Sequence, residues 1–168
     1  MATTHLESWV GPGETKARER VAQLAAALAR LQASGARNLL LAGDLNWHDD
    51  GEEGSLAARL PPGWLDAWAV LRPGEAGATY DTDANAMLRC DPHPLQARLD
   101  RALAKLADWE AADVRLVGTE ALPGVTRRRP ASASAAAADG EPQVTPVLPS
   151  DHFGLLLTLR RRAAAGDG

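Results

Sequence analysis

The sequence has 168 residues, of which 45% are hydrophobic, so one sizeable core and a single domain are expected. Its 18 basic and 22 acidic residues give a formal net charge of -4, which excludes a globally basic nucleic-acid binder but not one that relies on a cation and a local basic rim. A single cysteine, Cys90, excludes an intramolecular disulfide, and together with the lack of a signal-peptide pattern or a membrane-length apolar stretch it predicts an intracellular protein without a membrane partner.

The first predicted element is a helix over residues 15–33, where five apolar residues recur at spacings of three and four: Val21, Leu24, Ala25, Leu28 and Leu31. Thr15 is the expected N-cap, and Gly35 is expected just past the end of the helix. The apolar run that follows, residues 38–42, ends at Gly43 and predicts a strand that is buried on both faces.

The later elements are shorter. A helix is predicted over residues 64–71 after a Pro-Pro-Gly turn, and residues 79–82 are β-prone. The pattern of residues 96–106 fits a strand or a helix, with the strand favoured, and residues 114–117 and 154–160 predict two more strands.

Composition changes sharply over residues 127–148, which are rich in Ala, Ser, Pro and Gly and predict a disordered insertion. The three arginines 127–129 at its edge fit either a solvated loop or a contact with a nucleic-acid backbone. The tail, residues 163–168, is also expected to be disordered, so the folded domain is predicted to lie within residues 1–162.

Polar clusters stand at the ends of the predicted strands. In chain order they are residues 5–8, 43–46, 99–100 and 150–152. Each cluster alone has a structural explanation, because Gly, Asp, Asn and Ser form turns and caps and a lone histidine is often structural.

Together the clusters meet the needs of phosphodiester hydrolysis, which requires a base for water, neutral donors for the phosphate and a positive group for the developing charge. Asp44 can accept a proton from water, and Asn46 can donate to a non-bridging oxygen. His152 can stabilise the pentacovalent species if a carboxylate orients its ring, and Asp100 is the candidate. Asp151 is then left to approach a metal ion.

The order and spacing of these residues resemble the carboxy-terminal half of the endonuclease/exonuclease/phosphatase superfamily. Residues 43–46 match its GD-x-N signature, residues 98–100 its strand-borne aspartate, and residues 150–152 its terminal Ser-Asp-His. Residues 4–8 and 79–82 are most similar to the tyrosyl-DNA phosphodiesterase 2 branch. The resemblance implies an α+β fold: a partial DNase I-like sandwich with one β-sheet and flanking helices, whose first half is missing.

The same resemblance implies a Mg²⁺-dependent phosphodiesterase, with Mn²⁺ as a possible substitute, that repairs DNA 5′ ends linked to a tyrosine and resides in the nucleus. It makes Asp44 the general base or the residue that positions the water, Asn46 a phosphate ligand, His152 the transition-state stabiliser, Asp100 its partner and Asp151 the metal ligand. The implied substrate contacts are His5, Glu7, Ser8, Trp47, His48, Tyr80 and Asp81.

The sequence departs from the family pattern in two ways that bear on its expected activity. The family continues from its glutamate with Ser-Thr-Arg-Gly, whereas this chain has Ser8-Trp9-Val10-Gly11 and so lacks an arginine expected at the phosphate. The family also draws an Asn and a magnesium-binding Glu from sequence that precedes residue 5, so a fragment with impaired activity is expected. The open alternatives are a general nuclease, a small-molecule phosphatase and a non-catalytic fragment that binds DNA or protein.

Overall fold

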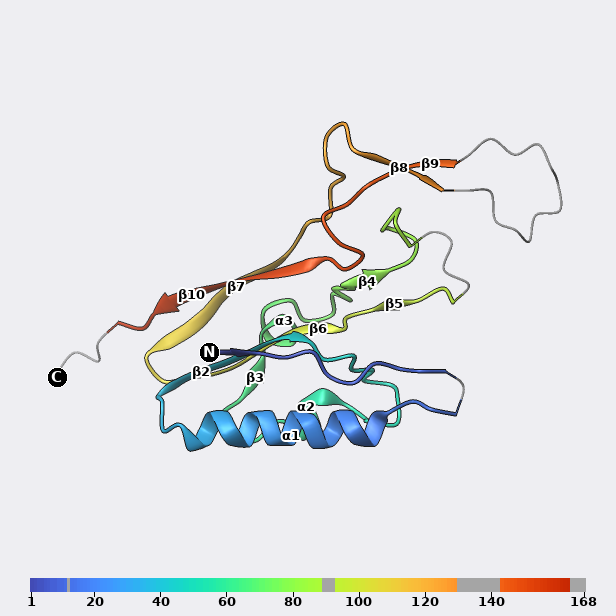
Figure 1. Cartoon of the computed structure of the whole chain (residues 1–168). Helices are drawn as coiled ribbons and strands as arrows, with labels where there is room; N and C mark the ends of the chain where they lie inside the picture. Colours follow the sequence, from blue (N-terminus) through green and yellow to red (C-terminus); the bar gives the residue numbers. More distant parts are fainter. Residues whose placement is uncertain (12, 89–92, 130–142, 164–168) are drawn as a thin grey trace.

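The computed structural model describes residues 1–11, 13–88, 93–129 and 143–163, and its central sheet has four strands in the order β1-β2-β6-β3 (Figure 1). These strands are β1 (Ala2–Thr3), β2 (Asn38–Asp44), β6 (Asp100–Leu106) and β3 (Leu65–Asp66). β1 runs parallel to β2, and β6 is antiparallel to both of its neighbours. The α+β class and the partial DNase I-like sheet expected from the sequence are confirmed.

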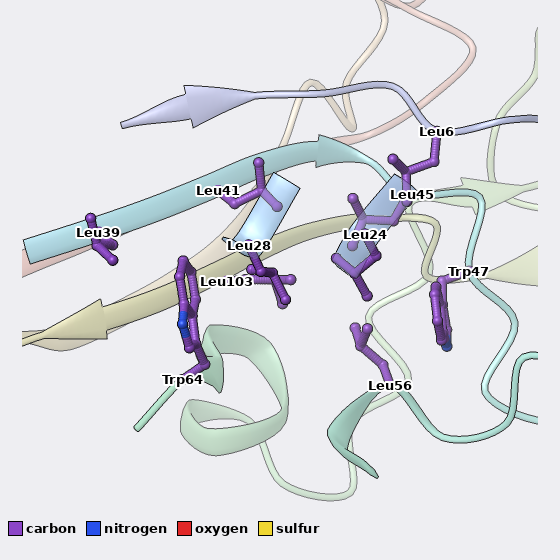
Figure 2. Close-up of a cluster of buried hydrophobic side chains, with 10 residues drawn as sticks. All are labelled: Leu6, Leu24, Leu28, Leu39, Leu41, Leu45, Trp47, Leu56, Trp64 and Leu103. Atoms are coloured by element: carbon purple, nitrogen blue, oxygen red, sulfur yellow. The ribbon is translucent and has the colours of Figure 1, made fainter. Parts of the chain in front are cut away.

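One face of this sheet is covered by α1 (Ala17–Ala33), with the short α2 (Leu56–Arg59) beside it (Figure 1). Leu24 and Leu28 of α1 point towards Leu41 of β2 and Leu103 of β6 in the main core cluster (Figure 2). Each fully buried leucine contributes about 1.5–3 kcal/mol relative to an exposed one. No described helix is long and apolar enough to cross a membrane.

The two ends of α1 differ in how well the sequence predicts them. Gly35 does lie past the end, with a φ of 69°, and its amide donates to the carbonyl of Gln32. The predicted N-cap is wrong: Lys16 holds that position in a left-handed conformation, without a side-chain cap. The hydroxyl of Thr15 donates instead to Glu52 Oε2, 3.0 Å away.

The second face of β2 is less covered than predicted. Leu39 and Leu41 are buried, whereas Leu40 and Ala42, which alternate with them, are only partly buried. A ribbon of β7 (Trp109–Val117) and β10 (Gly154–Arg161) lies on that side (Figure 1). An open cavity of about 430 Å³ separates the two layers. The expectation of burial on both faces is therefore wrong.

Two further antiparallel pairs extend from this body, β4 (Tyr80–Asp81) with β5 (Gln96–Ala97) and β8 (Thr126–Arg129) with β9 (Gln143–Pro146). The strand favoured for residues 96–106 is confirmed as β5 and β6. The helix predicted over 64–71 is shorter, because β3 occupies its start and α3 covers only Ala67–Leu71. The side chain of Asp66 caps α3 by accepting from the Trp68 amide.

The segment predicted to be disordered, residues 127–148, has ordered ends. Pairing of β8 with β9 contradicts the prediction there, because a change to small residues in the sequence does not exclude backbone pairing. Residues 130–142 lie outside the described residues, as do Cys90 and most of the predicted tail.

Candidate active site

Two carboxylates meet where the β2–β6 pair ends. Asp44 is the last residue of β2 and Asp100 the first of β6, and the two residues lie directly opposite each other in the antiparallel register. Directly opposite residues carry their side chains on the same face of a sheet. The sheet itself therefore brings together two groups that are 56 positions apart in the sequence (100 minus 44).

His152 completes this group from the loop that precedes β10. Its Nδ1 lies 2.8 Å from Asp100 Oδ2. The hydrogen bond that His152 donates to Asp100 is the main reason that the pKa of His152 is raised. Partial burial opposes this shift, and the negative charges of Asp100, Asp44 and Asp151 add to it. The positively charged imidazolium is thus favoured at this edge of the sheet.

The loop that carries His152 is held by a residue that sequence reasoning missed. Asn85 is fully buried, and its Nδ2 donates to the carbonyls of Ser150 and Asp151 at 3.1 and 3.0 Å. Ser150 Oγ accepts from the amide of His152 and donates to Asp151 Oδ1. Asn85 lies in a turn rich in polar residues, and no spacing in the sequence distinguishes it from its neighbours.

Thr79 is a second positioning residue that sequence reasoning missed. Its buried hydroxyl accepts from the amides of Leu99 and Asp100, each at 3.0 Å, and its carbonyl accepts from the amide of Phe153 at 2.7 Å. One threonine therefore links the backbone beside Asp100 to the backbone beside His152. The β-propensity and family resemblance of residues 79–82 did not assign this role to Thr79.

The turn after β2 has the geometry that its polar residues favour. Asn46 has a φ of 47°, in the left-handed region that asparagine tolerates better than most residues. Asp44 Oδ1 accepts from the Asn46 amide at 2.8 Å, and Asn46 Nδ2 donates to the carbonyl of Leu6 at 3.0 Å. The amide group of asparagine has two N–H donors, so it can hold Leu6 and still donate to a phosphate oxygen.

Gly43 lets the N-terminal segment run close beside this turn. A Cβ at Gly43, whose φ is 138°, would lie only 2.0 Å from the carbonyl oxygen of Thr4. Backbone hydrogen bonds from Thr4 to Ala42 and from Leu6 to Asp44 fix the approach. As a result His5, although exposed, has its Nε2 3.4 Å from Asp44 Oδ2.

A cavity of about 650 Å³ opens beside these residues. Of the predicted substrate contacts, Ser8, His48 and Tyr80 line it, together with Asn46 and His152. The ring of Tyr80 stands edge-on to that of His152, with centroids 5.2 Å apart. The cavity therefore adjoins the predicted catalytic residues.

The other four predicted substrate contacts, His5 among them, do not line this cavity. Trp47 is 1% exposed and belongs to the core, with its indole N–H donating to the Gly54 carbonyl, so the prediction that it touches a DNA end is wrong. Asp81 caps a turn by accepting from two backbone amides. Glu7 is exposed, and its backbone is held by Gln23 and Arg20.

A metal ion would find a sparse set of ligands. Within the described residues, no group of three or more His, Cys, Asp or Glu side chains is arranged to hold one. Asp151, the predicted ligand, offers a single exposed carboxylate next to His152. Magnesium usually binds through one or two carboxylates plus substrate phosphates and water, so these residues fit it only in part.

A buried ion network lies behind the site, around a residue whose role the sequence did not reveal. Arg101 is 3% exposed, and its guanidinium donates to Asp66 at 2.9 Å and to Asp49 at 2.8 Å. Its Nε donates to the carbonyl of Arg98, whose own guanidinium also bonds Asp66. Arg101 therefore joins β6 to the loop after β2 and to the start of α3.

Comparison with known proteins places these observations in context. The sequence profile of the Endonuclease/Exonuclease/phosphatase family matches residues 3–152. No curated protein sequence matches the chain significantly.

Several solved structures share the fold. TDP2 of D. rerio, solved with a single-strand DNA product, is 24% identical with a TM-score of 0.67, over 94% of this chain and 54% of that one. Truncated TDP2 of Caenorhabditis elegans is 21% identical with a TM-score of 0.62, over 96% and 53%. An endonuclease/exonuclease/phosphatase family protein of Bacteroides thetaiotaomicron is 14% identical with a TM-score of 0.52, over 94% and 47%. The chain spans about half the length of these structures.

Proposed function

Because the chain belongs to the endonuclease/exonuclease/phosphatase family, we propose that it is a metal-dependent phosphodiesterase that hydrolyses phosphoester bonds at DNA 5′ ends, with 5′-tyrosyl-DNA as the preferred substrate. The observation that carries this proposal is the meeting of Asp44, Asn46, Asp100 and His152 at one sheet edge, beside an open cavity. A family resemblance in the sequence could not by itself supply that arrangement.

Each of these side chains has a separate task in the proposed reaction. Asp44 takes a proton from the water that attacks phosphorus. His152, kept positively charged by Asp100, donates to the oxygen on which charge develops, and Asn46 donates to a non-bridging oxygen. The phosphorus–oxygen bond to the leaving group then breaks, leaving a 5′ phosphate on the DNA.

Asp151 would hold Mg²⁺, or Mn²⁺ in its place, together with the phosphate of the substrate. The ion would supply positive charge against the developing negative charge of the transition state. One carboxylate makes a weak site, so a low metal affinity and a low turnover are expected for this chain alone.

The choice of a DNA 5′ end rests on the cavity and on likeness to TDP2. Tyr80 and His48 line the cavity with rings that suit a planar substrate group, and the D. rerio TDP2 structure contains a single-strand DNA product. DNA ends as substrate would place the protein in the nucleus. A non-catalytic chain that binds DNA ends is the second candidate, and the single metal-binding carboxylate favours it.

A substrate panel tests the proposal. The full chain is incubated with Mg²⁺ and a 5′-phosphotyrosyl oligonucleotide, an unmodified oligonucleotide or a small phosphomonoester. Release of tyrosine from the first substrate, reduced about 10²–10⁴-fold by Asp44→Asn and unchanged by Glu110→Gln at a partly exposed position of β7, supports the proposal. Preferred cleavage of either other substrate favours a general nuclease or a phosphatase, and binding without cleavage favours the non-catalytic chain.

A further inference from the structure

Two aromatic rings form part of the cavity wall without a task in the reaction above. Trp9 and His93 both line the cavity, and their rings meet edge to face, with centroids 6.1 Å apart and an interplanar angle of 88°. Trp9 comes from the N-terminal segment and His93 from the loop before β5, so the two rings are brought together only by the fold.

Core packing does not account for the position of Trp9. Its side chain is 45% exposed, so much of the stabilisation that burial gives a tryptophan is not gained there. An exposed tryptophan on a cavity wall is a typical ligand contact.

The charges around the cavity indicate which part of a substrate this wall would meet. Asp50 and Glu52 line the same cavity, and they would repel a further phosphate group. Glu53 adds no net charge, because it is paired with Arg20 and both side chains are 2% exposed. An uncharged planar ring suits this part of the cavity better than a second phosphate.

We propose that Trp9, supported by His93, is a stacking subsite for an aromatic ring attached to the phosphate at His152. The inference rests on the proposed function and extends it to substrate selection. The ring is either the base of the terminal nucleotide or the ring of an aryl leaving group. Stacking on an aromatic side chain strengthens binding by roughly 5- to 150-fold relative to alanine.

Binding without turnover tests this subsite. The full chain is titrated, in EDTA, with three labelled oligonucleotides that carry a 5′ phosphate: one with a normal terminal nucleotide, one with an abasic terminal residue, and one with the abasic residue and a phenyl ester on the phosphate. Trp9→Ala should weaken binding about ten-fold for an end that carries the stacked ring, and less than two-fold for the bare abasic end. The first or the third oligonucleotide then identifies the source of the ring.

Two variants serve as controls. Trp9→Phe keeps an aromatic face and should retain most of the affinity, and Trp109→Ala removes an exposed tryptophan on β7 and should change nothing. Equal weakening of all three ends by Trp9→Ala, or no weakening of any, would overturn the subsite while leaving hydrolysis possible. Ring-dependent binding by a chain that hydrolyses nothing would keep the subsite and overturn the proposed activity. Failure of the wild type to bind any end would overturn the subsite, whereas hydrolysis would be judged by the Mg²⁺-containing substrate panel.

Discussion

At the residue scale, the pair formed by His152 and Asp100 sets the charge of the proposed transition-state stabiliser. Replacing Asp100 with asparagine removes the charged carboxylate whose hydrogen bond chiefly raises the pKa of His152. The pKa should fall towards the ordinary histidine value of about 6.5. A histidine NMR titration measures the change directly, and the alkaline limb of the rate profile should move to lower pH by the same amount.

The sign of the stability change follows from the same shift. A raised folded pKa stabilises the protein fully below the unfolded pKa, and this stabilisation is lost as pH rises through the folded pKa. Wild type and Asp100→Asn should therefore differ most in unfolding free energy at mildly acidic pH and least at alkaline pH. A difference that grows with pH would contradict the assignment of the charged pair.

Asn85 provides a second prediction at this scale. Asn85→Ala removes two partly buried hydrogen bonds to the backbone of Ser150 and Asp151 and leaves both carbonyls without that donor. We expect a loss of about 1–3 kcal/mol in unfolding free energy, measured with urea. Any hydrolytic rate should fall as well, because the loop that carries His152 loses its support. Stability within experimental error of wild type would show that the bonds are dispensable.

The reacting groups were predictable at this scale, whereas the residues that position them were not. Asp44, Asn46, Asp100 and His152 were marked by strand ends and by the chemistry that hydrolysis demands. Asn85 and Thr79 act through hydrogen bonds to distant backbone, and a single sequence contains no periodicity or spacing that reports such contacts. The prediction for Trp47 failed in the opposite way. Its position next to the GD-x-N turn suggested a ligand contact, whereas its side chain packs in the core.

At the element scale, the network around Arg101 fixes β6 to its neighbours. Arg101→Met would leave the buried carboxylate of Asp66 with one fewer cation and Asp49 without its Arg101 partner. Removing one partner of a buried pair costs about 3–5 kcal/mol. The loss here should lie below this range, because Asp66 keeps Arg98 and Asp49 is 40% exposed. Urea unfolding measures the loss, and Arg101→Lys should recover part of it.

Arg160→Met is the matched comparison, because Arg160 pairs with Glu110 through an exposed side chain. Exposed pairs contribute about 0–1 kcal/mol, so this variant should unfold almost like wild type. Equal losses of unfolding free energy in the two variants would mean that the buried network stabilises the protein no more than an exposed ion pair does.

Elements whose apolar residues recur at a regular spacing or form a continuous run were predicted well. The three- and four-residue spacing of apolar side chains located α1, and apolar runs located β2 and β10. The start of α3 was missed because Asp66 serves both as the end of β3 and as a helix cap. β8 and β9 were missed because their pairing with each other, rather than an apolar pattern, holds them.

At the scale of the whole molecule, the space between the central sheet and β10 leaves apolar side chains uncovered. Leu40 and Ala42 face Leu155–Leu157 across a cavity of about 430 Å³, and Leu156 is an exposed large apolar residue. Exposed apolar surface favours association. The chain by itself should therefore self-associate as its concentration rises, as measured by light scattering.

A lysine at this surface should oppose that association. Leu156→Lys is expected to lower the apparent mass at high concentration, whereas Val70→Lys, at an exposed site on α3, should have little effect. A wild-type chain that stays monomeric throughout the concentration range would contradict the expected association.

The proposed hydrolysis requires Asp44 and His152 to act on the same phosphorus atom. The most direct test is a double-mutant cycle on hydrolysis of a 5′-phosphotyrosyl oligonucleotide with Asp44→Asn, His152→Ala and the combined variant. Residues that act as a unit give strongly non-additive losses. We predict that the combined variant is no slower than the slower single variant; losses that multiply would mean that the two side chains work independently and that the proposed site is wrong.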